Sequence, residues 1–338
     1  MSAYLSQKSL GITTKIGCSV NCTYCPQGLF INQYKLCNAP QDMLLSFDNY
    51  KICIDKLPNT CDIHFAAMCE PWLNPQCTDM VLYAHEKGHK IVASTTLVGV
   101  TENDFNLIRN IPFKAFGLHI PDSLGYTKIN ITDEYLRLLK LFCEAKNPGG
   151  GALVTSYSCH SEDVHPAIAD IVPKWVKGIQ LIDFAGNVDS SELKAASSKT
   201  TKRDIVCIED RLKQNILLPN GLVTLCCMDF GIKHILGNLL TQSWDELHQS
   251  PEYIKIQNGM KDDEADILCR NCTNARNVTE LYQDYAAEKS KHLEALGMVS
   301  EAYAKTDEAI VSLREEYENS SSWRVTASLR AIKKFVKR

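Results

Sequence analysis

Three cysteines within eight residues constrain this chain more than any other feature of its sequence. Cys18, Cys22 and Cys25 have the spacing C-x3-C-x2-C, and they directly follow residues 10–16, which are predicted to form a strand. A structural zinc site uses four protein ligands, whereas three thiolates leave one metal position open. A [4Fe–4S] cluster held by three cysteines would have one iron free to bind another molecule. The spacing therefore favours such a cluster, with zinc as the alternative.

Composition supports metal ligation over disulfide bonding. The chain has 15 cysteines, an odd number, among 338 residues. Residues 1–16 lack a basic flank followed by an apolar run, so no signal peptide is predicted, and no run of 18 apolar residues predicts a membrane span. We therefore expect a cytoplasmic protein, in which clustered cysteines bind metal. The net charge of −4 argues against a general nucleic-acid binder.

A second set of cysteines lies further along the chain. Cys269 and Cys272 form a C-x2-C pair, preceded by Cys207 and by the adjacent Cys226 and Cys227. Four thiolates would close an iron–sulfur cluster or, alternatively, a zinc site. The other cysteines are scattered, and most are expected to be small buried hydrophobic residues. They are Cys37, Cys53, Cys61, Cys69, Cys77, Cys143 and Cys159, of which Cys69 is set apart by its neighbour Glu70.

Strand and helix patterns alternate through the first part of the chain. Strands are predicted at residues 10–16, 62–66, 89–93, 114–120, 152–156 and 178–184. Helical periodicity lies between them, as at residues 78–87 and 133–142. This alternation predicts an α/β fold with a parallel sheet.

The first cysteine motif, with Tyr24 before its third cysteine, resembles that of the radical S-adenosylmethionine (SAM) superfamily. The resemblance implies a partial (β/α)6 TIM-like barrel. It also implies that Cys18, Cys22 and Cys25 hold a [4Fe–4S] cluster whose open iron chelates SAM, with Tyr24 near the adenine. Active sites of such barrels lie at the C-terminal ends of the strands, where the cysteine loop falls.

Three further segments resemble SAM-binding parts of the same family. Glu70 precedes Pro71 as in the family's Gly-Glu-Pro, which implies a hydrogen bond to the SAM ammonium group, although Cys69 replaces a glycine. Ser94 and Thr95 resemble the hydroxyl-bearing segment that contacts the SAM methionine or ribose. Asn187 ends an Ala-Gly-Asn string that recurs in relatives with auxiliary clusters.

The pattern C-x13-G-x4-C from Cys207 to Cys226, followed by C-x2-C, resembles the SPASM domain and its shorter twitch form. The resemblance implies one auxiliary [4Fe–4S] cluster, held by Cys207, Cys226, Cys269 and Cys272. A hairpin turn at residues 219–221 is predicted to bring Cys226 back towards Cys207. Adjacent residues on a strand face opposite sides, so either Cys226 or Cys227 would be the ligand, and the sequence leaves this choice open.

We expect three regions: a radical SAM core at residues 1–200, a small α+β twitch/SPASM-like domain at 201–280, and a C-terminal helix with a basic tail at 281–338. Residues 319–338 contain six basic and no acidic side chains, interleaved with apolar ones. Such a tail suits an anionic surface, including the inner membrane surface, or an acidic partner. A solvated tail is the alternative. Residues 322–330 are similar to a tail segment of bacterial surface-polysaccharide glycosyltransferases.

The resemblance implies reduction by a flavodoxin- or ferredoxin-like donor, reductive cleavage of SAM to a 5′-deoxyadenosyl radical, and hydrogen abstraction from the substrate. We expect a carbohydrate or glycan precursor that is dehydrogenated, epimerised or deoxygenated. A peptide- or protein-modifying maturase is the alternative within the family, and a non-catalytic zinc-binding scaffold is the alternative outside it. Cys69 and Cys227 lie beside predicted site residues, which makes them candidate catalytic thiols that return a hydrogen atom to the substrate; buried structural thiols are the alternative.

Overall fold

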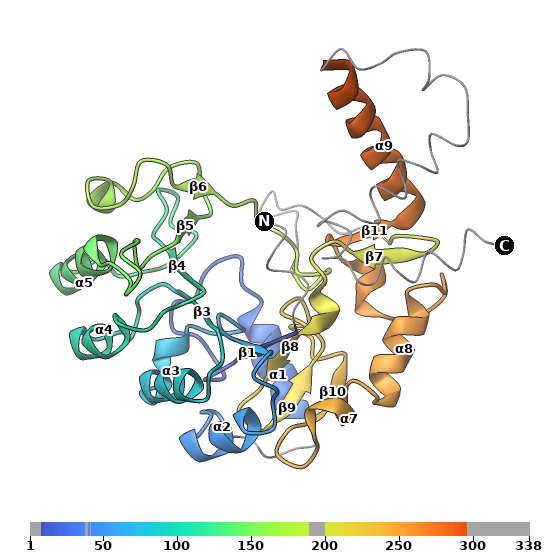
Figure 1. Ribbon diagram of the computed structural model, residues 1–338, viewed down its shortest axis with the longest axis horizontal. Coiled ribbons are helices and arrows are strands. Elements are labelled where there is room, and N and C mark those ends of the chain that lie inside the picture. Colours follow the sequence, from blue (N-terminus) through green and yellow to red (C-terminus); the bar gives the residue numbers. More distant parts are fainter. Residues whose placement is uncertain (1–7, 38–39, 41, 189–199, 296–338) are drawn as a thin grey trace. The chain divides into compact units, whose positions relative to one another are not determined.

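The fold is that of a computed structural model, which describes residues 8–37, 40, 42–188 and 200–295 (Figure 1). The chain divides into two compact units. The larger unit consists of Lys8–Ser197 and Lys213–Ile254. The smaller unit consists of Met1–Gln7, Ser198–Leu212 and Lys255–Arg338.

The larger unit is built on a nine-stranded sheet with the order β10-β9-β8-β1-β2-β3-β4-β5-β6. Neighbouring strands from β8 through β1 to β6 are parallel, whereas β8, β9 and β10 pair antiparallel. The parallel α/β prediction is therefore confirmed. The strands are β1 (Ser9–Ile12), β2 (Asp62–Phe65), β3 (Ile91–Thr95), β4 (Ala115–His119), β5 (Ser156–Cys159), β6 (Lys177–Gly178), β8 (Gln214–Leu217), β9 (Leu222–Thr224) and β10 (Ile235–Asn238).

Three predicted strands of the parallel series differ from the observed ones: β1 ends at Ile12, before the end of the predicted 10–16, and the last two strands are displaced or shortened. β5 begins at Ser156, where the prediction ended, and β6 covers two residues instead of the predicted 178–184. β6 ends the described sheet, so it gains a hydrogen-bonded neighbour on one side alone. Beyond it, Phe184 and Ala185 have positive φ angles of 48° and 59°, and turn hydrogen bonds from residues 187 and 188 replace the ladder. Extended structure cannot continue through such a turn.

Figure 1 shows α2 (Phe47–Ile54), α3 (Cys77–Glu86), α4 (Glu102–Ile108) and α5 (Asp133–Glu144) in a row outside the strands. Helix α5 shows why these segments are helical. Thr132 caps it by accepting the N–H of Tyr135, and its buried residues recur at the 3–4-residue spacing of one helix face. They are Tyr135, Leu138, Leu139 and Phe142.

The predicted hairpin at residues 219–221 joins β8 to β9. Gly221 has φ of 82°, and a Cβ atom there would lie 2.4 Å from Asn238 Oδ1, so glycine is required. Because β8 pairs with β1, residues 213–254 complete the sheet of the larger unit. The same segment carries α7 (Trp244–Leu247), and α8 (Pro251–Gly259) follows it.

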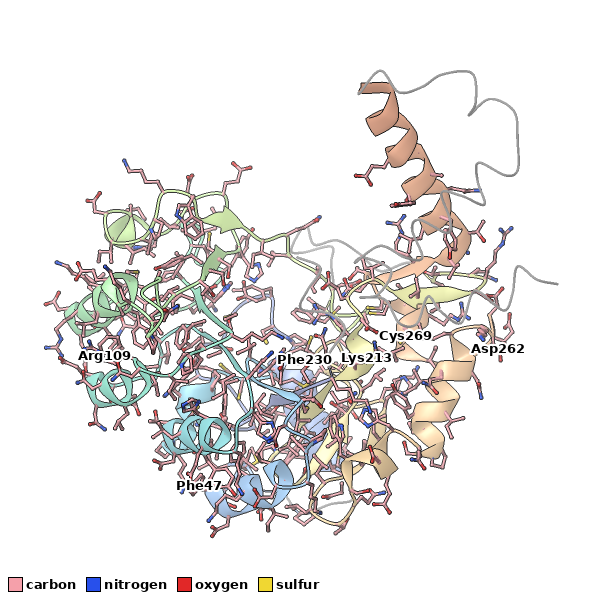
Figure 2. The ribbon with its side chains drawn as sticks, viewed as in Figure 1. Phe47, Arg109, Lys213, Phe230, Asp262 and Cys269 are labelled. Atoms are coloured by element: carbon pink, nitrogen blue, oxygen red, sulfur yellow. The ribbon has the colours of Figure 1, made fainter. Side chains whose placement is uncertain are left out.

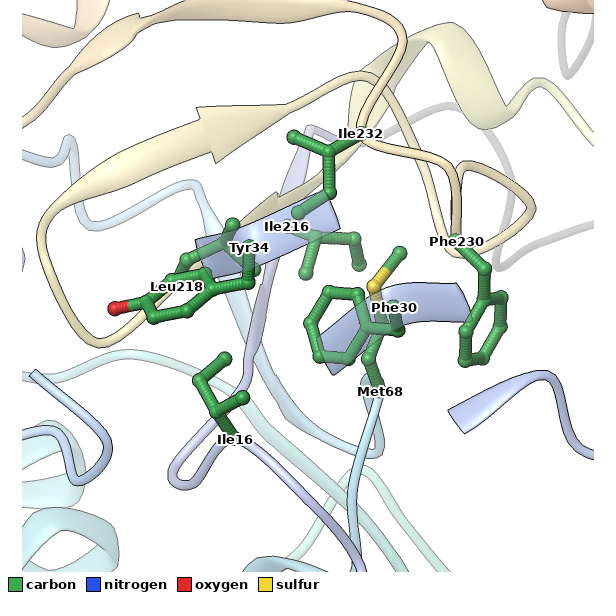
Figure 3. Packing of buried hydrophobic residues seen from close by; sticks show 8 residues of the cluster. All are labelled: Ile16, Phe30, Tyr34, Met68, Ile216, Leu218, Phe230 and Ile232. Carbon is green, nitrogen blue, oxygen red and sulfur yellow. The ribbon is translucent and has the colours of Figure 1, made fainter. Parts of the chain in front are cut away.

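A cluster of apolar side chains packs α1 (Gln27–Leu36) against the β8–β10 segment (Figure 3). Its buried members are Ile16, Phe30, Tyr34, Met68, Ile216, Leu218, Phe230 and Ile232. Phe30 is fully buried and meets Phe230 edge-on, with ring centroids 5.8 Å apart. Truncating such a ring to alanine costs about 3–5 kcal/mol, so this cluster is a main support of the helix that follows the cysteine loop.

The smaller unit pairs β7 (Ile205–Cys207) antiparallel with β11 (Ala275–Asn277), which leads into α9 (Val278–Ala295). The predicted C-terminal helix at residue 281 and beyond is thus present as far as the chain is described. The basic tail and residues 322–330 lie outside the described residues, so their interpretation stays a prediction. Within the described part of the chain, no helix is both long and apolar enough to cross a bilayer.

Candidate functional site

A cavity of about 300 Å3 opens in the larger unit at the C-terminal ends of its strands. The cysteine loop after β1, the segments after β2 and β3, the end of β4 and the turn after β9 all contribute to it. The side chains that line it are those of Cys18, Val20, Cys22, Tyr24, Cys25, Gln27, Ala66, Ala67, Met68, Cys69, Glu70, Ser94, Thr95, Thr96, His119, Phe184, Cys227 and Phe230. The cavity thus collects seven predicted site residues of the first motif and the SAM-binding segments, together with both candidate thiols.

The cysteine loop turns tightly enough to present all three thiols to the cavity. Asn21 adopts a left-handed conformation with φ of 53°, and the N–H of Cys25 donates to the carbonyl of Cys22 at 3.2 Å. Burial raises the pKa of the Cys18 and Cys22 thiols and raises that of Cys25 to about 12. Thiolates at these positions therefore need a nearby positive charge, which iron would supply.

The donor set fits an iron–sulfur cluster. Three thiols and no other strong ligand come from one short loop, which suits a cluster with one open iron. Among the described residues, no three His, Cys, Asp or Glu side chains converge on a single ion position. A cluster does not require this, because each cysteine binds a different iron. Gln27 lines the same cavity, and its buried Oε1 atom has no hydrogen-bond partner.

Glu70 is buried and held by the segment after β3. Its Oε1 atom accepts from Thr95 Oγ1 at 2.5 Å, and Oε2 accepts from the backbone N–H and the hydroxyl of Thr96, both at 2.7 Å. Burial raises the pKa of Glu70 to about 7, although these donors act in the opposite direction. A buried carboxyl group whose pKa is raised by desolvation is suited to a cationic partner, because a nearby positive charge would stabilise its ionised form.

Ser94 and Thr95 occupy successive positions at the end of β3, and both line the cavity. The Thr95 hydroxyl donates to Glu70 and accepts the N–H of Leu97 at 2.8 Å. Thr95 therefore orients Glu70, whereas Ser94 is the hydroxyl of this pair that is available to a bound molecule. Thr96, which sequence reasoning did not assign, binds Glu70 more extensively than Thr95 does.

Tyr24, which lies between Cys22 and Cys25 in the sequence, lines the cavity, and its hydroxyl contacts His119 at the end of β4. Its hydroxyl lies 3.0 Å from His119 Nε2 and 3.4 Å from Thr127 Oγ1. Its ring packs against His160 with centroids 4.0 Å apart. Burial lowers the pKa of His119 to about 4, so this imidazole is neutral near pH 7. Its Nδ1 atom lies 3.1 Å from Ser158 Oγ.

Both candidate thiols line the same cavity. Cys69 lies beside Glu70, with its Sγ atom 3.5 Å from Thr14 Oγ1, and burial raises its pKa to about 11. Cys227 follows the end of β9, in a turn and not on the strand that the sequence suggested. Cys226 is buried, with 5% of its surface exposed, and it does not line the cavity. The two adjacent cysteines therefore have different surroundings.

Asn187 does not line the cavity. Its side-chain amide donates to the carbonyls of Phe184, at 2.7 Å, and Met228, at 3.1 Å. Phe184 lines the cavity, and Met228 lies between the lining residues Cys227 and Phe230. Asn187 thus ties together two segments that shape the cavity wall.

Cys207, Cys269 and Cys272 belong to the smaller unit. Cys207 ends β7 and pairs with Ala275 of β11, three residues after Cys272, while Cys269 (labelled in Figure 2) lies in the 3₁₀ turn Leu268–Asn271. Arg270, which is 3% exposed, holds this turn by donating to the carbonyls of Thr201, Arg203 and Gly259. The predicted ligand Cys226 lies in the larger unit.

Sequence reasoning missed several residues of the site. His119 and Phe230 line the cavity, yet no motif marks them. The position of His119 at the end of a predicted strand was a usable signal, because side chains there face the site of a parallel α/β fold. Phe230 reaches the cavity through packing with Phe30 and carried no such signal.

Comparisons with known proteins agree with this arrangement. A family model described as an iron–sulfur cluster-binding domain, SPASM, matches residues 207–273. No curated protein matches the chain. The structure of BtrN in complex with AdoMet and 2-DOIA is similar, with a TM-score of 0.52 and 15% identity over 80% of this chain and 94% of that one.

Two further solved structures are more distant. They are anSMEcpe with bound AdoMet (TM-score 0.46, 14% identity, 78% of this chain and 86% of that one) and Streptococcus suis SuiB bound to precursor peptide SuiA (TM-score 0.44, 11% identity, 74% and 66%). Neither adds to the assignment, which rests on the fold and on the domain match. Residues 207–273 form an iron–sulfur cluster-binding domain of the SPASM type, and the chain shares the fold of the BtrN structure.

Proposed function

We propose that this chain is a radical SAM enzyme, with SAM and two [4Fe–4S] clusters as its cofactors, that removes a carbon-bound hydrogen atom from a carbohydrate or glycan precursor. The observation that carries the proposal is the cavity, in which Cys18, Cys22 and Cys25 meet Glu70 and two further thiols. When bound there, the cluster and SAM supply the carbon-centred radical that such a step needs. The AdoMet bound in BtrN supports the same cofactor. The substrate class rests on the similarity of residues 322–330 to glycosyltransferase tails.

The residues of the cavity have distinct tasks in this proposal. Cys18, Cys22 and Cys25 hold the first cluster. Glu70, oriented by Thr95 and Thr96, accepts a hydrogen bond from the SAM ammonium group. Ser94 contacts the methionine or ribose, and Tyr24 lies beside the adenine. Cys207, Cys226, Cys269 and Cys272 hold the auxiliary cluster.

The fate of the substrate radical depends on what quenches it. A thiol of Cys69 or Cys227 would give it a hydrogen atom, so that a carbon–hydrogen bond forms as the sulfur–hydrogen bond breaks. One electron from the flavodoxin- or ferredoxin-like reductant and one proton from solvent would then restore the thiol. This route gives epimerisation. Transfer of one electron to the auxiliary cluster and of one proton to solvent would give dehydrogenation. Loss of water from a 1,2-diol radical, followed by uptake of one electron from the reductant and one proton from solvent, would give deoxygenation.

The test uses anaerobically reconstituted protein, dithionite, SAM and deuterated probes. Deuterium in 5′-deoxyadenosine after incubation with uniformly deuterated nucleotide sugars or amino sugars would support the proposal. Deuterium transfer from deuterated peptides alone would favour the maturase alternative. The Cys18→Ala, Cys22→Ala, Cys25→Ala triple variant is the control, because it should form no 5′-deoxyadenosine while keeping the auxiliary irons.

Metal analysis of the same preparations separates the proposal from the zinc-scaffold alternative. Two [4Fe–4S] clusters correspond to about eight irons per chain, and the triple variant should keep about four. Zinc in place of iron after reconstitution, without SAM cleavage, would support the scaffold instead.

A further inference from the structure

The loop that carries the three cysteines is held by the segment that follows β4. The backbone N–H of Thr23 donates to the carbonyl of Tyr126 at 3.0 Å. The hydroxyl of Tyr24, the next residue, lies 3.4 Å from Thr127 Oγ1. Both contacts lie between Cys22 and Cys25, so they fix the part of the loop that directs these two thiols.

A carboxylate orders both residues that make these contacts. Asp122 is 1% exposed, and its Oδ1 atom accepts the backbone N–H groups of Leu124 and Tyr126, each at 3.0 Å. Its Oδ2 atom accepts the N–H of Thr127 at 2.8 Å. The Asp122 side chain therefore fixes the backbone conformation at Tyr126 and Thr127. The carbonyl of Tyr126 accepts the N–H of Thr23, and the hydroxyl of Thr127 faces Tyr24.

We propose that Asp122 is a positioning residue for the first iron–sulfur cluster and for SAM. It acts through Tyr126 and Thr127 on the cysteine loop, and thereby on the geometry of the open iron. Groups that orient metal ligands without touching the metal typically change metal affinity or activity by 10- to 100-fold. The inference concerns the cofactor site and does not depend on which substrate the enzyme uses.

The test replaces Asp122 by asparagine and measures SAM binding by the holoenzyme. The Asp122→Asn substitution keeps the size of the side chain, but it turns an acceptor oxygen into an amide nitrogen that faces at least one of the three backbone donors. The readout is the change in the electron paramagnetic resonance spectrum of the dithionite-reduced first cluster as SAM is added. We expect the iron content of Asp122→Asn to match wild type and its dissociation constant for SAM to rise about tenfold.

A matched control separates positioning from loss of general stability. Asp104 also accepts from three donors, which are Thr101 N at 2.8 Å, Thr101 Oγ1 at 2.6 Å and Thr78 Oγ1 at 2.6 Å. These donors belong to the cap of α4 and to α3, and none is part of the cysteine loop. Asp104→Asn should therefore bind SAM with wild-type affinity.

Wild-type SAM affinity in Asp122→Asn, or an equal loss in Asp104→Asn, would overturn the proposal. If Asp122→Asn does not fold, Thr127→Val provides the test. This variant loses the hydroxyl contacts to Tyr24 and His119 and keeps the backbone N–H that Asp122 binds. Weaker SAM binding by Thr127→Val supports the proposal, and unchanged binding contradicts it. Since SAM is the probe, the absence of turnover with sugars would not affect either result.

Discussion

Replacing Glu70 by glutamine removes a charge from the cavity while keeping the length of the side chain. The carboxylate accepts from Thr95 Oγ1, Thr96 N and Thr96 Oγ1, and a backbone hydrogen bond from Trp72 also lowers its pKa. The proposed SAM ammonium group would be a further, charged donor to this side chain. A hydrogen bond to a charged group contributes about 1.5–3 kcal/mol. We therefore expect SAM to bind about 10- to 150-fold more weakly.

The measurement is calorimetric titration of SAM into anaerobically reconstituted protein, beside thermal denaturation of the same samples. Glu246→Gln is a matched control. Glu246 accepts from the N–H and the hydroxyl of Ser243, at 2.6 and 2.7 Å, just as Glu70 accepts from both groups of Thr96. Glu246 caps α7 and does not line the cavity. The control should therefore retain wild-type SAM affinity.

Two results would refute this reasoning. Wild-type SAM affinity in a folded Glu70→Gln protein would show that Glu70 does not bind the ammonium group. An equal loss of affinity in Glu246→Gln would attribute the effect to a general weakening of the fold.

Three further predictions concern the auxiliary cluster, the thiols and pH. Cys269→Ala should keep about four of about eight irons and still form 5′-deoxyadenosine but lose the product, and an unchanged iron content would contradict its ligand role. Cys69→Ala or Cys227→Ala should form 5′-deoxyadenosine and stall before product. Wild-type turnover in D2O should place deuterium at the inverted carbon. Full product from both variants would exclude these two thiols as hydrogen donors. Burial lowers the pKa of His64 to about 4, below about 6.5 in an unfolded chain, so the unfolded state gains a proton first as pH falls. The free energy of unfolding should thus drop by about 2–3 kcal/mol between pH 6.5 and 4. The His64 ring is partly exposed, so screening by solvent makes this figure an upper value. Urea denaturation at several pH values measures the drop, and an equal drop in His64→Gln would count against this cause.

Local patterns were sufficient to predict most of the parallel sheet. β2 and β4 fall within their predicted ranges, and α5 follows the predicted helical face. The prediction was wrong beyond β6, where residues 179–184 are apolar enough for a strand but form no continuous strand and end in a left-handed turn. An apolar sequence indicates that a segment is buried, but a strand also needs a hydrogen-bonded neighbouring strand, which the sequence pattern does not show.

The candidate site was predictable where its residues are neighbours in sequence. The spacing of Cys18, Cys22 and Cys25 already places three thiols on one loop, and the Glu70 segment follows its strand directly. His119 was less accessible to sequence reasoning, because its role depends on Tyr24 and Ser158, each from a different part of the chain.

The sequence by itself determined that this chain carries two clustered sets of cysteines and an α/β core, because spacing and periodicity are local properties. The tertiary structure alone decided that Cys227 lines the same cavity as Cys25, and that Asp122 orders the segment that holds the cysteine loop. Both results depend on contacts between distant segments, such as the pairing of β8 with β1. Such contacts arise from the packing of whole strands and loops, which no local residue pattern records.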